Sequence, residues 1–162
     1  QKLISQLFLD AFANPWLAEQ EDQARIALST LTAQGDRLAF STDSYVIDPL
    51  FFPGGDIGKL AVCGTANDVA VSGATPRYLS CGFILQEGLA MDTLNAVVQS
   101  MARTAREAGI AIVTGDTKVV QRGAADKLFI NTAGLGAIPT DVHWGAQRLA
   151  VGDVLIVSGT LG

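Results

Sequence analysis

The feature that most constrains the fold of this chain is the segment 92–108, which has the period of an amphipathic helix and lies between two apolar runs. Asp92 stands where an N-cap belongs, and Gly109 follows the last periodic residue as a helix-ending glycine does. The flanking runs 77–86 and 110–120 have the composition of strands. This order predicts a layer of helix on sheet. The helical stripe consists of Leu94, Val97, Val98 and Met101.

Further segments complete a mixed order of helices and strands. Residues 2–13 predict an amphipathic helix that Asn14-Pro15 ends, and residues 59–73 predict a helix that is apolar on nearly all sides. We therefore expect strands that pair as neighbours, with two long helices over one face, which is an α+β layer and not a strictly alternating parallel fold. The first helix carries its apolar face on Leu3, Ile4, Leu7, Phe8 and Ala11. The remaining predicted strands cover residues 24–31, 37–47, 127–138 and 153–158.

Composition and charge exclude several classes of protein. With 162 residues, 49% of them hydrophobic and 17% charged, the chain suits one folded domain with a core. Its net charge of −5 argues against a general nucleic-acid binder, and no apolar run reaches the ~18 residues of a membrane span. Cys63 and Cys81 lie in apolar runs without metal-binding spacing, so we expect buried, reduced thiols and a reducing compartment. The single histidine, His143, is expected on the surface.

The stretch PGGDIGK at residues 53–59 is typical of a phosphate-binding loop but departs from the strict Walker motif. Its first glycine and its Gly-Lys pair are one residue too close together, and Leu60 replaces the metal-binding hydroxyl. What remains is a general property: its glycines let backbone N–H groups approach an anion at a helix start, beside Lys59. A sharp turn with a solvated lysine explains the pattern equally well, and both interpretations stay open. The glycines concerned are Gly54, Gly55 and Gly58.

Three aspartates add weight to the phosphate interpretation. Asp43 and Asp116 each stand at the end of a predicted strand, and Asp68 follows Asn67 in about the second turn of the 59–73 helix. Carboxylates near a nucleotide make sense with Mg²⁺ between them, because that ion prefers oxygen ligands. Each aspartate also has a plain alternative as a turn, cap or surface residue. The plain alternative fits Asp68 least well, since the residues around it are apolar and a carboxylate among apolar residues needs a partner.

Together these residues resemble the purM-like superfamily of ATP-binding proteins, which includes AIR synthase and thiamine-monophosphate kinase. Within it, FFPGGDIGKLAVCGT at 51–65 and GDTKVV at 115–120 resemble the HypE family of hydrogenase maturation proteins, along essentially the whole chain. The resemblance implies an α/β domain with a mostly antiparallel four-stranded sheet and helices on one face. It also implies that two such sheets pair into a barrel in a homodimer, with ATP sites near the interface.

The resemblance implies a reaction and its partners. HypE-like enzymes use ATP to dehydrate a C-terminal S-carbamoyl cysteine, a thiocarboxamide, to a thiocyanate that supplies cyanide ligands for [NiFe]-hydrogenase. The HypF carbamoyltransferase loads the cysteine, a HypC–HypD complex receives the cyano group, and the setting is cytoplasmic. As alternatives, the isolated chain is a non-catalytic dimerisation and docking domain, or belongs to a purM-like phosphotransfer enzyme.

The resemblance also implies roles for individual residues. Asp43, Asp68 and Asp116 correspond to the Mg²⁺–ATP carboxylates, and Lys118 is the candidate catalytic residue, with a second phosphate contact as its alternative. Residues 1–162 are expected to form a purM-like N-terminal domain, without the C-terminal domain and cysteine tail, so that the chain alone is inactive. The other nucleotide-binding positions implied are Gly54, Gly55, Gly58, Lys59, Asn67, Gly115 and Thr117.

Overall fold

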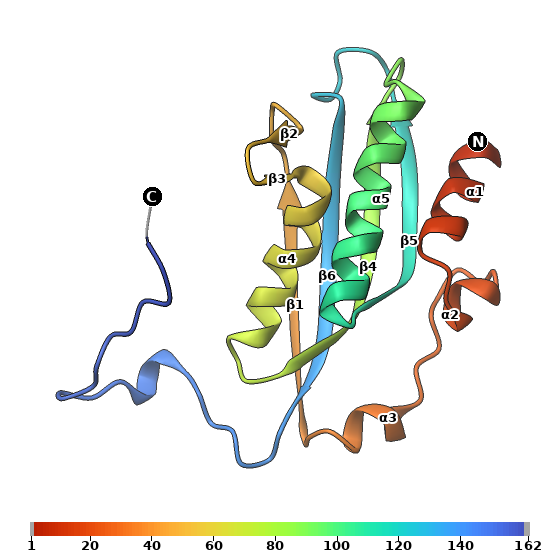
Figure 1. Ribbon diagram of the computed structural model, residues 1–162. Coiled ribbons are helices and arrows are strands. Elements are labelled where there is room, and N and C mark those ends of the chain that lie inside the picture. The colour runs from red at the N-terminus through yellow and green to blue at the C-terminus, as the bar shows by residue number, and fades with distance from the viewer. Residues whose placement is uncertain (1, 161–162) are drawn as a thin grey trace.

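The computed structural model describes residues 2–160 and has a mixed four-stranded sheet at its centre (Figure 1). Its order is β1 (Arg37–Tyr45), β6 (Leu128–Ile138), β4 (Thr75–Gln86) and β5 (Ala111–Val120). Strand β6 runs antiparallel to both β1 and β4, whereas β4 and β5 are parallel. The expectation that strands pair with their sequence neighbours is therefore wrong for β1 and β4. Strand β6, the last in sequence, lies between β1 and β4. Helix α5 follows β4 and brings the chain back to the end of the sheet where β4 began, so that β5 runs parallel to β4.

Helices α4 (Ile57–Ala70) and α5 (Met91–Ala108) cover one face of the sheet, as expected (Figure 1). Their apolar sides and the helix-facing side chains of β4 and β6 form the main core. The predicted stripe of 92–108 is buried in full, which confirms its helical period. The side chains that are almost fully buried include Ile57, Leu79, Leu94, Met101, Leu128 and Ile130.

The starts of the two long helices differ from the sequence predictions. Helix α4 begins two residues before the predicted 59–73, because the Asp56 side chain accepts hydrogen bonds from the N–H groups of Gly58 and Lys59 and caps the helix. Asp92 is not the N-cap of α5, since Ala90 occupies that position and Asp92 lies in the first turn. The helix-ending glycine is confirmed, with Gly109 in the left-handed conformation at φ 68°.

The N-terminal segment consists of three short helices, of which the first packs on α5, the second on β5 and the third on β6 at the far face of the sheet. They are α1 (Lys2–Ala11), α2 (Pro15–Ala18) and α3 (Leu28–Thr32). The predicted strand over 24–31 is wrong: its second half is helical, and its first half forms no ladder. The apolar residues of this segment pack on the sheet instead, and Leu31 forms a small core cluster with Tyr78 and Val113.

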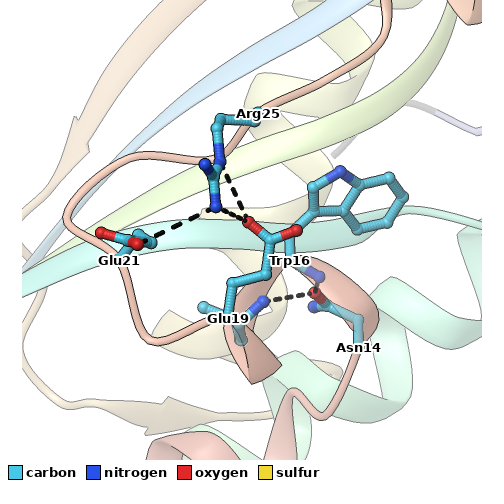
Figure 2. A network of polar contacts seen from close by, with 6 residues as sticks. Asn14, Trp16, Glu19, Glu21 and Arg25 are labelled. Atoms are coloured by element: carbon cyan, nitrogen blue, oxygen red, sulfur yellow. Dashed lines mark hydrogen bonds and ion pairs between the residues drawn. The ribbon is translucent and has the colours of Figure 1, made fainter.

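Polar contacts hold this segment in place (Figure 2). Helix α1 ends at Ala11, earlier than the predicted residue 13, and Asn14 caps α2 by accepting from the N–H groups of Trp16 and Leu17. Its Nδ2 donates 2.8 Å hydrogen bonds to the carbonyl oxygens of Phe12 and Ile112, the second of which lies on β5. An ion pair between Arg25 and Glu19, at 2.8 Å, closes the loop after α2.

The C-terminal part of the described chain leaves the sheet (Figure 1). It contains one 3₁₀ turn, η1 (Ala146–Arg148), and the predicted strand over 153–158 is wrong for this structure. The apolar side chains of residues 154–157 are 61–95% exposed, because the described chain offers that run no strand to pair with. Two short strands, β2 (Phe51–Phe52) and β3 (Gly55–Asp56), form a small hairpin before α4. His143 is exposed, as expected.

Candidate functional site

Two of the three predicted aspartates lie along the seam between β1 and α4. Asp43 pairs in the ladder with Thr132, which is buried under α4, so Asp43 projects from the helix-covered face of the sheet. Ser41, two residues earlier on that face, donates a 3.2 Å hydrogen bond to Oδ2 of Asp68 on α4. Asp68 stands in the last turns of α4, not its second turn, and is exposed rather than buried. Water can therefore solvate this carboxylate, and the Ser41 hydroxyl is its hydrogen-bond partner in the protein.

A chain of buried hydroxyl groups lies behind this seam. The Tyr45 hydroxyl is 3.1 Å from Oγ1 of Thr65, which is 2.6 Å from Oγ1 of Thr132. Thr132 also donates to the carbonyl oxygen of Ala61 at 2.8 Å. Burial raises the pKa of the Tyr45 hydroxyl, and the negative charge of Asp43 adds to the rise. These bonds fix α4 against β1 and β6 directly beside the two aspartates.

The third aspartate forms a separate charged pair on β5. Oδ2 of Asp116 lies 2.6 Å from Nζ of Lys118, and its Oδ1 accepts from the N–H of Thr117 at 2.8 Å. The hydrogen bond from Lys118 is the main reason that the pKa of Asp116 is lowered, and the Thr117 bond contributes next. Both side chains of the pair are about two-thirds exposed, at 67% and 69%. The pair stands within β5, not at a strand end as the sequence predicts.

These residues border an open hollow between β5 and the N-terminal helices. The hollow has a volume of about 830 Å³, and α1 and α2 form its other wall. Its lining includes the apolar side chains of Phe8 and Phe83 and the thiol of Cys81, together with the charged side chains of Asp116 and Lys118. The Cys81 thiol is fully buried, and that burial raises its pKa, so it is a core residue, as expected. Cys63 is only partly buried.

One chain does not bring the three aspartates together. Strands β1 and β5 are the two outer strands of the sheet, about three strand spacings or ~14 Å apart. The ladder also aligns Asp116 with Gly82, Asn131 and Ser44 in one row across the sheet. This row lies on the face of the sheet opposite Asp43. Within residues 2–160 no three His, Cys, Asp or Glu side chains are grouped as metal ligands. A metal centre formed by all three aspartates stays a prediction, and it would need aspartates from two copies of the chain.

The glycine turn before α4 already holds a carboxylate at the helix start. Asp56 accepts from the N–H groups of Gly58 and Lys59 through Oδ1, and from the Ser100 hydroxyl at 2.5 Å through Oδ2. These two N–H groups are therefore not free for a phosphate. A Cβ on Gly58 would lie 2.5 Å from the carbonyl oxygen of Val97, so this glycine permits close packing of α4 on α5.

The rest of the turn is exposed. Gly54 has φ +92° and lies where the chain reverses between β2 and β3, a backbone conformation that glycine adopts without strain. Nζ of Lys59 is 3.2 Å from the carbonyl oxygen of Gly54, and the lysine is otherwise solvated. Its ammonium group can still reach an anion, whereas the helix start cannot without displacing Asp56.

Three further predicted positions have clear surroundings. Asn67 is exposed on α4 beside Asp68. A Cβ on Gly115 would lie 2.1 Å from the carbonyl oxygen of Cys81, so the glycine allows β5 to approach β4. Thr117 is in register with Phe83 and so shares the helix-facing side of the sheet.

Sequence reasoning missed Asp56 and Ser41. Asp56 follows two glycines and precedes the apolar residues of α4 directly, which is a recognisable N-cap signal. Ser41 stands two residues before Asp43, and the period of a strand puts both on one face.

Comparison with known proteins decides which family has this arrangement. The family model for AIR synthase related proteins, N-terminal domain, matches residues 20–138. The chain belongs to this family. Within it the chain is of the HypE type, because it is 82% identical over 162 residues to the carbamoyl dehydratase HypE of Escherichia coli strain K12. That match covers 100% of this chain and 48% of the relative. The chain spans about half the length of the curated HypE proteins it matches.

Solved HypE structures have the same fold. A crystal structure of E. coli HypE matches with a TM-score of 0.92 over 94% of this chain and 47% of that one. A HypE solved in complex with ATP is 62% identical, with a TM-score of 0.80 over 86% of this chain and 40% of its own. A HypE–HypF complex matches at 47% identity, with a TM-score of 0.62 over 85% and 43%. In the described part of this HypE-type chain, every helix is too short or too polar to cross a membrane.

Proposed function

We propose that this chain is the ATP-binding, dimer-forming part of a HypE-type carbamoyl dehydratase. The whole protein would dehydrate a C-terminal S-carbamoyl cysteine to a thiocyanate, for the cyanide ligands of [NiFe]-hydrogenase. The observation that carries the proposal is the identity of 82% with a carbamoyl dehydratase HypE along the entire chain. The HypE solved with ATP supports the nucleotide. Two free cysteines agree with a cytoplasmic setting.

The chemistry of the exposed side chains fits Mg²⁺ and a nucleotide. Asp43 and Asp68 offer carboxylate oxygens on one seam, with Ser41 between them, and oxygen is the ligand atom that Mg²⁺ prefers. We assign both, together with Asp116, to the metal, and Asn67 to the nucleotide beside it. Because Asp116 lies on the opposite outer strand of the sheet, the set would be completed between two copies in the homodimer.

Lys59 and the exposed glycines of its turn are the proposed phosphate contacts. The ammonium group of Lys59 supplies the positive charge, and the exposed backbone of Gly54 allows close approach, with the half-buried Gly55 beside it. Gly58 is assigned a weaker role, since its N–H is bonded to Asp56. Gly115 and Thr117 hold Asp116 at the correct place on β5.

Lys118 is the proposed catalytic residue. When bound, ATP supplies the phosphoryl group that turns the amide oxygen into a good leaving group. Because Lys118 already donates to Asp116 as an ammonium group, it is suited to stabilise negative charge rather than to accept a proton. The ion pair therefore favours charge stabilisation over the role of a base.

The open face of the sheet supports a homodimer. Phe40 and Leu38 on β1 and Ile84 on β4 are 69%, 54% and 41% exposed on the side away from α4 and α5. Phe40 and Leu38 lie toward one end of this face and Ile84 toward the other, and exposed apolar groups of this size favour a protein interface. We propose a second copy as the partner there, and the HypF carbamoyltransferase and a HypC–HypD complex as partners of the whole protein.

The proposed function is tested by exchanging this chain for the matching half of E. coli HypE. The chimera, loaded with a carbamoyl group on its C-terminal cysteine, should lose one water from that group in the presence of Mg²⁺ and ATP, as seen by mass spectrometry. Lys118→Gln should lower the rate roughly a hundredfold or more, whereas Lys127→Gln should not. A chimera that folds, dimerises and binds ATP without dehydrating the cysteine would overturn the proposal.

A further inference from the structure

Two hydrogen bonds join β1 to α4 on either side of Asp43. Ser41, two residues before it, donates to Oδ2 of Asp68 at 3.2 Å. Tyr45, two residues after it, has its hydroxyl oxygen 3.1 Å from Oγ1 of Thr65. All three side chains of β1 share one face, since side chains alternate along a strand. Asp43 therefore lies opposite the turn of α4 that runs from Thr65 to Asp68.

Close packing holds the seam between β1 and α4 together. A Cβ on Gly64 would overlap the Tyr45 hydroxyl oxygen, so the absence of a side chain there lets the tyrosine reach α4. Tyr45 and Thr65 are both buried, and Thr65 is bonded in turn to Thr132 on β6 at 2.6 Å. The core therefore sets the distance between β1 and this turn of α4, and the two aspartates on the seam cannot move apart freely.

Each carboxylate of the seam has one oxygen engaged and one oxygen left. Oδ1 of Asp43 accepts from the N–H of Ser44 at 2.7 Å, and Oδ2 of Asp68 accepts from Ser41. Within residues 2–160, the other oxygen of each aspartate accepts no hydrogen bond, and neither aspartate forms an ion pair. The pair thus offers two separate ligand oxygens and a negative charge without a protein cation.

The number and rigidity of ligand oxygens distinguish Mg²⁺ sites from Ca²⁺ sites. Ca²⁺ takes about six to eight oxygens in a flexible arrangement, often with both oxygens of one carboxylate. Mg²⁺ demands near-ideal octahedral geometry and is usually held through a small number of carboxylates, with phosphate oxygens and water at the other positions. A rigid seam with one free oxygen on each aspartate fits Mg²⁺. The Ser41 hydroxyl is what limits Asp68 to one free oxygen.

We propose that Ser41 is a positioning residue that makes the seam selective for Mg²⁺ over Ca²⁺, because its hydroxyl engages Oδ2 of Asp68 and leaves Oδ1 as the ligand oxygen. This inference rests on the proposed function, which assigns Mg²⁺ to these aspartates. Without the hydroxyl, the Asp68 carboxylate can rotate and offer both oxygens, which suits Ca²⁺. Ser41 thereby acts on the ion through Asp68 and not by contact with it.

The test compares two titrations of the whole chain, one with Mg²⁺ and one with Ca²⁺, followed by the ¹H–¹⁵N signals of Asp43 and Asp68. The unsubstituted chain should bind Mg²⁺ more tightly than Ca²⁺. Ser41→Ala should weaken Mg²⁺ binding about tenfold, as the loss of a group that orients a metal ligand typically does, and should leave Ca²⁺ binding equal or tighter. The ratio of the two dissociation constants is decisive, because a general loss of structure would weaken the binding of both ions alike.

Three further variants make the test specific. Ser44→Ala is the matched control, because the Ser44 hydroxyl accepts from Asn131 on the other face of the sheet and its N–H to Asp43 remains. It should leave both affinities unchanged. Ser41→Thr keeps a hydroxyl at a strand position that suits a β-branched residue, so it should restore the preference for Mg²⁺. Asp68→Asn should weaken the binding of both ions, which locates them at the seam.

The outcomes separate this inference from the proposed function. The role of Ser41 is overturned by an unchanged ratio in Ser41→Ala, by equal effects of Ser41→Ala and Ser44→Ala, or by an unsubstituted chain that binds neither ion or prefers Ca²⁺. A non-hydrolysable ATP analogue, added to the Mg²⁺-loaded chain, tests the function itself. If Ser41 controls the ion preference but the analogue does not bind, the positioning role stands and the ATP-dependent function fails. If the analogue binds with Mg²⁺ while Ser41→Ala behaves like the unsubstituted chain, the function stands and the positioning role fails.

Discussion

Tyr45 joins the core of the molecule to the carboxylate seam, because its hydroxyl is bonded to Thr65 while Asp43 is two residues away on the same strand face. Tyr45→Phe should lower the free energy of unfolding by about 1 kcal/mol, the typical net value of one hydrogen bond. Urea unfolding at neutral pH measures this. Tyr78→Phe is the control, since no described residue is bonded to its hydroxyl, and its effect should be near zero. Equal effects of the two variants would contradict a role for the hydroxyl chain.

Tyr45 also predicts how the stability of the fold changes at high pH. Because the pKa of Tyr45 is raised in the folded state, its contribution to stability is complete below the ordinary value of 10.0 and is lost as the pH rises through the folded pKa. Tyr45→Phe should remove this part of the alkaline loss of stability.

Asp116 predicts a shift in the opposite direction. Lys118 holds the pKa of this exposed carboxyl below its ordinary value of 3.8. The paired state is therefore fully present above that value and is lost as the pH falls through the lowered pKa. An NMR titration of the Asp116 side-chain carbon should give a midpoint below 3.8, and Lys118→Gln should move it upward. A midpoint that does not change in that variant would show that the ion pair does not persist in solution.

At the scale of the elements, Asp56 is predicted to act as a structural cap and not as part of a phosphate site. Asp56→Ala removes three hydrogen bonds at the start of α4, two from backbone N–H groups and one from Ser100. Thermal or urea unfolding should show a loss of about 2 kcal/mol. Asp92→Ala, in the first turn of α5 without a capping bond, should cost well under half as much. A small effect of Asp56→Ala combined with tighter nucleotide binding would indicate that Asp56 only occupies an anion site.

The elements also show what a sequence can and cannot predict. The helix over 92–108 and the strands over 77–86 and 127–138 follow from periodicity, because each buries one regular face against the core. The strand over 37–47 follows from its alternating sequence, although Tyr45 is its one buried residue. The segments 24–31 and 153–158 have the composition of strands but no neighbour to pair with among the described residues. Strand composition alone does not supply a hydrogen-bonding partner, and the position of β6 inside the sheet is equally invisible in the order of segments.

The sequence predicts the residues of the candidate site one by one, but it does not predict how they are arranged. The motifs around Asp43, Asp68 and Asp116 are recognisable from the chain. The separation of Asp43 and Asp116 to opposite outer strands and opposite faces depends on the strand order and the register, which are long-range properties.

At the scale of the whole molecule, the open sheet face should form a homodimer. Phe40→Glu places a charge on the open face, at its most exposed apolar side chain, and should convert the dimer to a monomer near 16.9 kDa in light scattering. Leu3→Glu is the control, since Leu3 is 78% exposed on α1 and away from that face. If the unsubstituted chain is already monomeric at high concentration, the open face has a different partner.

The central claim is that the described chain contains a Mg²⁺-dependent nucleotide site formed by its aspartates. The most direct measurement is a calorimetric titration of the chain with a non-hydrolysable ATP analogue, with and without Mg²⁺, together with Asp116→Asn and the control Asp126→Asn. The account predicts binding that requires Mg²⁺ and is weakened at least about tenfold, or ~1.4 kcal/mol, by Asp116→Asn alone. Absence of binding, or binding that is equally tight without Mg²⁺ and in Asp116→Asn, would contradict it.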